Sequence, residues 1–227
     1  MSTLVRVNGA ALRPDVSGAL YWPEEGALVV ADLHLEKGSA YAARGTLLPP
    51  YDTRATLARL AEAVRRYAPG LVIALGDSFH DGCARQRLAR EEAAAIRALT
   101  AAVDWVWIVG NHDPAPPGDL GGRVAREFRR GPLTLRHEPE PGDGLGEIAG
   151  HLHPKAALTA RGKRLVRRCF AGDGNRLVMP AFGAYAGGLD VLDAAFRPLF
   201  PGPFQAHLLG RDEVYRVSSR RLVALGA

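Results

Sequence analysis

Four short polar clusters in this sequence of 227 residues carry side chains suited to metal chemistry. The clusters are Asp32-Leu33-His34, Gly76-Asp77-Ser78-Phe79-His80-Asp81, Gly110-Asn111-His112-Asp113 and Gly150-His151-Leu152-His153. Together they offer carboxylate, amide and imidazole ligands, and no thiolate belongs to the set. This mixture indicates a catalytic centre for Mn²⁺, Fe or Zn²⁺ with positions left for water, and it argues against a structural zinc site.

The clusters form a candidate site because each one directly follows an apolar run. An isolated Asp-x-His or His-x-His is more often a surface loop or a hydrogen-bonded histidine than a pair of ligands. In a parallel sheet, however, the residues that follow the strands gather along one edge. We also expect alternation to place Asp32 with His34, and His151 with His153, on one face of an extended segment. The four clusters in this order predict a dinuclear metal site.

Strands and helices alternate in the first half of the chain, and this order would position the clusters. Apolar runs at residues 27–31, 71–75 and 105–109 predict buried strands. Helical spacing follows Asp52, which we expect to cap a helix, and strong helix formers fill residues 85–102. This order implies right-handed crossovers and a largely parallel sheet, with ligands beyond the carboxyl ends of its strands.

The second half of the chain reads mostly as short strands. Strand-like runs occur at residues 133–136, 147–149, 165–170, 176–179 and 205–209. Turn signals at residues 141–144 and 201–203 separate them. Because we find no repeat and no linker, we expect one domain over residues 1–227.

Composition places the chain among globular proteins and leaves nucleic-acid binding open. The net charge of +5 fits a phosphate-binding surface, but the scarcity of lysine beside many arginines also fits genome-wide codon bias. Cys83 and Cys169 form no metal or disulfide motif, and Cys169 reads as a buried small residue. Met1-Ser2-Thr3 begins no secretory leader, and no apolar run is long enough to cross a bilayer, so we expect a cytoplasmic protein without membrane contact.

The order of the clusters resembles the pattern of the calcineurin-like metallophosphoesterases, which is D-x-H, GD, GNH[DE], a lone His and GH-x-H. The resemblance covers residues 32–153. It implies that Asp32, His34 and His153 hold one metal ion. Asn111, His151 and the lone histidine would hold a second, and Asp77 would bridge the two. We assign the lone histidine to His137, which ends the run at 133–136; the alternative is a surface histidine.

The mechanism implied by the resemblance is in-line attack on phosphorus by water that the metal pair activates. His112 would stabilise the phosphoryl group or protonate the leaving oxygen. Asp113 would orient the His112 ring. Both residues are therefore predicted to affect turnover more than metal binding.

One departure from the family pattern is informative. Many relatives carry GD-x-x-D, whereas here His80 occupies the fifth position and Asp81 follows it. The run Gly-Asp-Ser-Phe-His is similar to the motif of double-strand-break repair nucleases, in which that histidine contacts the scissile phosphate. The alternative is a histidine that supports its neighbours.

More of the chain resembles a narrower group, the bacterial DNA ligase-associated metallophosphoesterases. The matching segments are residues 32–38, 137–139, 150–154 and 179–185. The resemblance implies a manganese-dependent phosphodiesterase or endonuclease that acts on DNA in repair, in functional association with a DNA ligase and a helicase. It also implies a four-layer α/β/β/α sandwich, with two mixed sheets face to face and helices outside.

The sequence is also compatible with other functions, and it suggests roles for residues outside the metal motifs. The same metal core would serve a phosphatase or a phosphodiesterase of small or cyclic nucleotides, and a non-catalytic scaffold is a remote alternative. Arg44 and Lys155 are candidates for binding the substrate's flanking phosphates. Trp105 and Trp107 are predicted to pack on a sheet and not to stack on bases. The sequence does not predict an oligomeric state.

Overall fold

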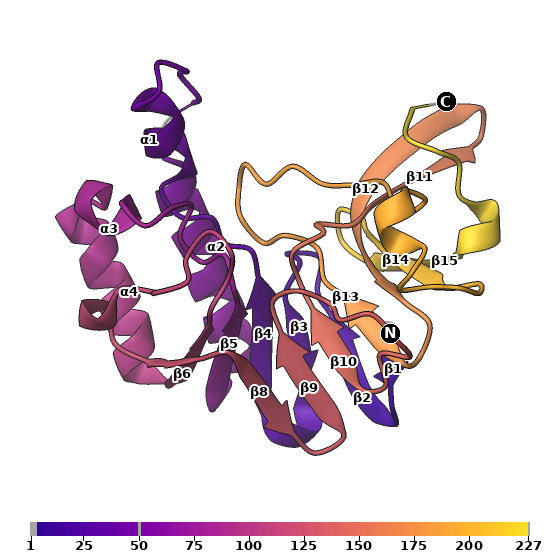
Figure 1. The fold of residues 1–227 in the computed structure, drawn as a ribbon, viewed down its shortest axis with the longest axis horizontal. Helices are drawn as coiled ribbons and strands as arrows, with labels where there is room; N and C mark the ends of the chain where they lie inside the picture. The colour runs from indigo at the N-terminus through magenta and orange to yellow at the C-terminus, as the bar shows by residue number, and fades with distance from the viewer. Residues whose placement is uncertain (1–3, 50, 227) are drawn as a thin grey trace.

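A computed structural model describes residues 4–49 and 51–226, so the N-terminal residues 1–3 considered above lie outside the described part. Two mixed β-sheets pack face to face, as Figure 1 shows, which confirms the predicted sandwich of sheets. Within the described ranges, no helix combines the length and apolar character needed to cross a bilayer.

The first sheet contains seven strands in chain order. They are β1 (Val5–Val7), β2 (Ala10–Pro14), β3 (Leu20–Trp22), β4 (Ala27–Ala31), β5 (Leu71–Leu75), β6 (Asp104–Ile108) and β7 (Arg123–Ala125). Strands β1 to β4 are antiparallel and β4 to β7 are parallel. The parallel part confirms the predicted alternation of strands and helices.

The strands of the second sheet lie in the order β15-β14-β12-β13-β10-β9-β8, and β11 pairs with β12. Its strands are β8 (Glu127–Arg130), β9 (Leu133–Arg136), β10 (Glu147–Ala149), β11 (Lys155–Ala160), β12 (Lys163–Gly172), β13 (Arg176–Val178), β14 (Gln205–Leu209) and β15 (Val214–Ser218). Strands β9, β10 and β13 are parallel, so the segments after β9 and β10 leave the sheet at the same edge.

Helices α2 (Asp52–Tyr67), α3 (Ala84–Arg87) and α4 (Arg90–Ala102) pack on the outer face of the first sheet. The other helices are α1 (Lys37–Ala42) and the short 3₁₀ helices η1 (Pro23–Glu25), η2 (Gly118–Leu120), η3 (Ala194–Phe196) and η4 (Ser219–Arg221). On the second sheet the outer layer is thin: η3 and the chain after it bring Phe196, Phe200 and Phe204 against the sheet. Cys169 lies fully buried in the same cluster, as predicted.

Strand alternation divides the core into layers. In β4, Val29 faces the second sheet while Leu28 and Val30 face the helices. Trp105 and Trp107 are both 2% exposed and pack in the helix-side cluster, which confirms that they serve sheet packing.

Two helix boundaries differ from the prediction. The stretch 85–102 is interrupted because Leu88 adopts an extended conformation and inserts into the core between α3 and α4. Asp52 is the first residue of α2 and does not cap it, since the N-cap is Tyr51. Its carboxylate instead accepts a hydrogen bond from the Gly38 N–H at 2.9 Å, which ties α1 to α2.

Candidate metal centre

The seven predicted metal ligands come together where loops of the two sheets meet. Asp32, Asp77 and Asn111 follow β4, β5 and β6, at one edge of the first sheet. His137 follows β9, and His151 and His153 follow β10, in the second sheet. Asp32, His34, Asp77 and His137 are nearly inaccessible to solvent, while the remaining three ligands are more exposed. The site is therefore assembled from both halves of the chain.

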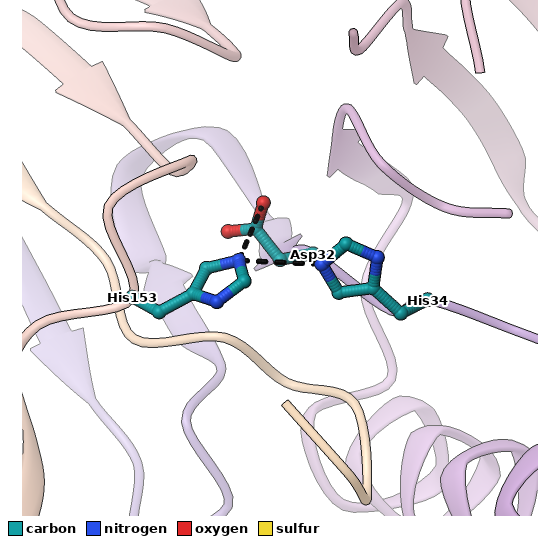
Figure 2. Close-up of side chains that lie close together, drawn as sticks. All are labelled: Asp32, His34 and His153. Atoms are coloured by element: carbon teal, nitrogen blue, oxygen red, sulfur yellow. Dashed lines mark hydrogen bonds and ion pairs between the residues drawn. The ribbon is translucent and has the colours of Figure 1, made fainter. Parts of the chain in front are cut away.

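Asp32, His34 and His153 form the first group, and one ligand atom from each lies within 4.8 Å of the others. Figure 2 shows the three side chains converging from opposite sides. The Nε2 atoms of His34 and His153 are 3.3 Å apart, and His153 Nε2 lies 3.3 Å from Asp32 Oδ1. One carboxylate and two imidazoles at this spacing form a candidate site for a divalent metal ion.

Asp77, His137 and His151 form the second group, again with ligand atoms within 4.8 Å of one another. Asn111 joins them, because its Oδ1 lies 2.9 Å from His137 Nε2 and 3.1 Å from His151 Nδ1. His137 is 5% exposed, so the alternative of a surface histidine is wrong.

Asp77 lies between the two groups. Its Oδ1 is 3.4 Å from His137 Nε2 in the second group. Its Oδ2 is 4.0 Å from His34 Nε2 in the first. A carboxylate with one oxygen toward each group has the placement that a bridging ligand needs.

The chemistry of the second group fits a cation. His137 Nδ1 lies 3.1 Å from the Leu75 carbonyl, which only accepts, so this nitrogen carries a proton. Its Nε2 then presents a lone pair toward Asn111 Oδ1, 2.9 Å away, with His151 Nδ1 at 3.2 Å. A positive ion bound among these atoms would let both ring nitrogens and the amide oxygen face it as acceptors. A histidine that donates its other N–H to a carbonyl is also the usual arrangement of a metal ligand.

In the first group, His34 is kept in the neutral, ligating form. Burial, followed by the nearby charges of His153, Lys37, His80 and His112, lowers the pKa of His34 to about 2. The imidazole is therefore unprotonated at neutral pH and its lone pair is free to bind a metal ion.

The backbone at the ligands differs from the prediction. Asp32, His34, Asp77, His151 and His153 all have positive φ, between 44° and 68°, so the expected extended segments are wrong. The loops after β4 and β5 run side by side instead, with His34 N–H donating to the Asp77 carbonyl at 2.8 Å. Such left-handed conformations cost energy in residues other than glycine, and they cluster at functional sites.

Asp113 has different partners from the predicted one. Its carboxylate accepts hydrogen bonds from the Ser78, Phe79 and Gly110 N–H groups at 2.8, 3.1 and 3.1 Å. The His112 ring is held instead by the His80 carbonyl, 2.9 Å from Nδ1. Asp113 therefore joins the loops after β5 and β6, and the prediction that it orients His112 is wrong.

His112 and His80 stand beside the ligand groups with their rings stacked, 5.3 Å between centroids. The His80 carbonyl accepts from His112 Nδ1, so this nitrogen carries a proton. The other ring nitrogen, Nε2, faces the centre and lies 3.9 Å from Asp77 Oδ2. Burial, followed by the charges of Lys37 and His112, lowers the pKa of His80 to about 4. His80 Nδ1 is buried without a hydrogen-bond partner in the described part of the chain.

The structure also places the cations around the centre. Arg44 lies exposed in the loop after α1, near enough for its charge to lower the pKa of His80. Lys37 was missed by sequence reasoning: it opens α1, and its charge acts on both His34 and His80. Its place five residues after Asp32 was the available signal. Lys155 lies in a separate pocket with three arginines.

The chain is similar to a known protein family and to solved structures. A family model described as calcineurin-like phosphoesterase matches residues 27–169. The solved structure of nuclease MPE from Pseudomonas putida has a TM-score of 0.74 at 33% sequence identity, covering 96% of this chain and 100% of that chain. YfcE, a phosphoesterase from E. coli, has a TM-score of 0.43 at 14% identity, over 84% of this chain and 97% of that one. No curated protein sequence matches. A family match over more than half of its length means that the chain belongs to the calcineurin-like phosphoesterase family.

Proposed function

We propose that this protein is a two-metal phosphodiesterase that cleaves DNA. The observation that carries the proposal is the position of Asp77 between two groups of ligands, with His112 Nε2 facing the same carboxylate. The choice of nucleic acid is supported by the likeness to a nuclease across almost the whole chain.

Each proposed metal ion has its own set of ligands. Asp32, His34 and His153 would hold the first, and Asn111, His137 and His151 would hold the second, with Asp77 shared between them. Two divalent cations bound there neutralise charge on the phosphoryl oxygens and lower the pKa of an attacking water. Mn²⁺ is our first choice because of the sequence resemblance, and Fe and Zn²⁺ suit the same donors.

The residues around the ligands act on the substrate itself. His112 is held by the His80 carbonyl, so its Nε2 is available to stabilise the phosphoryl group or to protonate the leaving oxygen. His80, whose ring stacks on that of His112, would contact the scissile phosphate. Arg44 and Lys155 extend positive charge away from the centre to flanking phosphates.

Asp113 supports this arrangement indirectly. By accepting N–H groups from both loops, it fixes the distance between the segment that carries Asp77 and the segment that carries Asn111 and His112. A setting in DNA repair, and an association with a DNA ligase and a helicase, is supported by the sequence resemblance alone.

A substrate panel with Mn²⁺ tests the proposal. The purified protein is assayed on a phosphomonoester, on bis(p-nitrophenyl) phosphate and on single-stranded and gapped DNA. We expect activity on the bis-ester and on DNA. Activity on the monoester alone would overturn the nuclease proposal, and activity on the bis-ester without DNA would indicate a small diester as substrate.

A variant of the shared ligand tests the two-metal part. Asp77→Asn keeps the size of the side chain but removes its charge, so hydrolysis should be lost while the far-ultraviolet circular dichroism stays unchanged. Unchanged turnover would show that Asp77 does not bridge two metal ions. Complete loss of activity together with loss of the fold would require the same test on His153, which is more exposed.

A further inference from the structure

A second pocket, of about 460 Å³, is lined by positive side chains and no acidic one. Its lining combines segments far apart in the sequence: the turn after β2, the start of β11, the middle of β12 and the end of β14, with residues Val16, Lys155, Val166, Arg167, Arg168, Leu209, Gly210 and Arg211. The arm formed by β11 and β12 stands on the side of the molecule opposite α1 in Figure 1. Four cations around one cavity are the signature of a site for a polyanion.

The positive charges of this pocket are not neutralised from within the protein. In the described part of the chain, Lys155, Arg167, Arg168 and Arg211 form no ion pair with a carboxylate within 4.0 Å. The pocket beside Asn111 differs, because its Arg136 is paired with Glu127, Glu140 and Glu147. Charge that is left unpaired inside a concave surface attracts a negative ligand.

The strand register places two of these positive side chains where they destabilise the sheet. Lys155 and Arg168 are directly opposite each other in the antiparallel pair of β11 and β12. Side chains at directly opposed positions share a face of the sheet, and like charges there destabilise it. Sheet stability therefore gives no reason for two cations at these positions, whereas a ligand that bridges them does.

Arg168 is held in place before any ligand arrives. Its Nη1 donates to the Ala181 carbonyl at 2.8 Å, and burial lowers the pKa of its guanidinium without bringing a carboxylate near it. A cation that is already fixed loses little conformational entropy on binding, which favours affinity.

The pocket lies close to the metal centre along the chain. Lys155 is two residues after the proposed ligand His153, and two residues of extended chain span at most about 7 Å. The loop after β13 connects the two places. A Cβ built on Gly183 would lie 2.4 Å from the Leu33 carbonyl beside the centre, and one on Gly188 would lie 2.4 Å from the His153 carbonyl and 2.9 Å from the Lys155 side chain.

We propose that this pocket binds the phosphodiester backbone of the DNA strand on one side of the scissile bond. The inference rests on the proposed nuclease function and adds three arginines that it did not include. Since phosphate contacts carry no base information, the pocket holds the strand in register without sequence preference. A small diester occupies the metal centre without reaching the pocket.

The test uses two exposed residues of the pocket. The double variant Arg167→Gln/Arg211→Gln is compared with Arg65→Gln/Arg97→Gln, which makes the same change of charge on the exposed faces of α2 and α4. Arg168 is left intact because its hydrogen bond to Ala181 also supports the loop. Binding of a fluorescent single-stranded oligonucleotide is measured by anisotropy over a range of salt concentrations, and cleavage of DNA and of bis(p-nitrophenyl) phosphate is measured in parallel.

The pocket variant should bind DNA about tenfold more weakly, with a slope of log K against log salt that is less steep by about 1.4 for two lost contacts. Its turnover of the small diester should match that of the control. Equal DNA affinity and equal salt slope in both variants would overturn this inference alone. Failure of the unmodified protein to bind or cleave DNA, with the small diester still cleaved, would overturn the nuclease proposal and this inference with it.

Discussion

The carboxylate of Asp113 receives three backbone hydrogen bonds, from Ser78 and Phe79 in one loop and from Gly110 in the other. In Asp113→Ala these buried donors lose their acceptor, and each unsatisfied group costs roughly 1–3 kcal/mol before the loops relax. We expect the free energy of unfolding to fall by about 2–4 kcal/mol. Urea denaturation of the metal-free protein measures this change.

A role in orienting His112 would give a different result. In that case Asp113→Ala would lower turnover while the urea midpoint stayed near that of the unmodified protein. Because His112 is held by the His80 carbonyl, His112→Ala serves as the comparison that removes the ring without touching the three backbone bonds.

The ligand set could be predicted from residue types because its members follow strands in a recognisable order. The conformation of those ligands could not. Positive φ at Asp32, His34 and Asp77 depends on pairing between the loops after β4 and β5, such as the bond from His34 N–H to the Asp77 carbonyl. The role of Asp113 could not be predicted for the same reason, since two of its three partners, Ser78 and Phe79, are backbone groups of a loop 35 and 34 residues away.

At the scale of single elements, the turn that ends β5 controls the second ligand group. Gly76 has a φ of +67°, and a Cβ there would lie 2.4 Å from the His137 ring. Gly76→Ala should therefore displace His137 and weaken metal binding by about 10–100-fold, as changes next to metal ligands commonly do. Isothermal titration with Mn²⁺ measures the affinity.

Gly26→Ala is the matched control for this change. Gly26 also has a positive φ, of +55°, but a Cβ there meets only the Gly70 nitrogen at 4.0 Å. Both variants carry the backbone strain of alanine in this region, and one alone disturbs a ligand. Equal metal affinities in the two variants would refute the steric argument.

Strand β14 contains a buried histidine that makes stability depend on pH. Burial, and then the charge of Arg216, lowers the pKa of His207 to about 4. Between pH 6.5 and pH 4, His207 is mostly protonated in the unfolded chain and mostly neutral in the folded protein. This residue therefore makes the free energy of unfolding fall as pH decreases through that window. From pH 7 to pH 5 the loss assigned to His207 is about 2 kcal/mol.

The variant His207→Gln isolates this contribution because glutamine does not titrate. Guanidinium denaturation of both proteins, without metal, should show a steeper loss of stability for the unmodified chain between pH 7 and pH 5. Other histidines titrate equally in both proteins and cancel in the difference. Parallel curves would mean that His207 titrates alike in the folded and unfolded states.

Some elements were predictable from the chain and others were not, for a physical reason. Strands β4, β5, β9, β10 and β14 occur at the predicted residues because each is a continuous apolar or alternating run buried in the sandwich. Strands β1 and β3 were missed; each forms by antiparallel pairing with a neighbouring strand, β1 with β2 and β3 with β4. The interruption of the helical stretch at Leu88 was not predicted. Helix propensity depends on residue type and carries no information about a side chain that packs into the core.

At the scale of the whole molecule, both ligand groups join the two sheets. The first group takes Asp32 and His34 from the first sheet and His153 from the second. The second group takes Asp77 from the first sheet and His137 and His151 from the second. A metal ion bound to either group links the halves of the sandwich across their shared edge, and the unfolded chain offers no such set of ligands.

Metal binding should therefore stabilise the entire fold. At a metal concentration of about 100 times Kd, one site contributes about 2.7 kcal/mol, which for a chain of this size raises Tm by roughly 5–10 °C. Thermal unfolding with Mn²⁺ should show this rise relative to the protein in chelator, and potassium chloride at equal ionic strength should not produce it. In Asp77→Asn most of the rise should disappear, because the variant loses the carboxylate nearest to both groups. A rise of equal size in Asp77→Asn would place the stabilising metal outside these two groups.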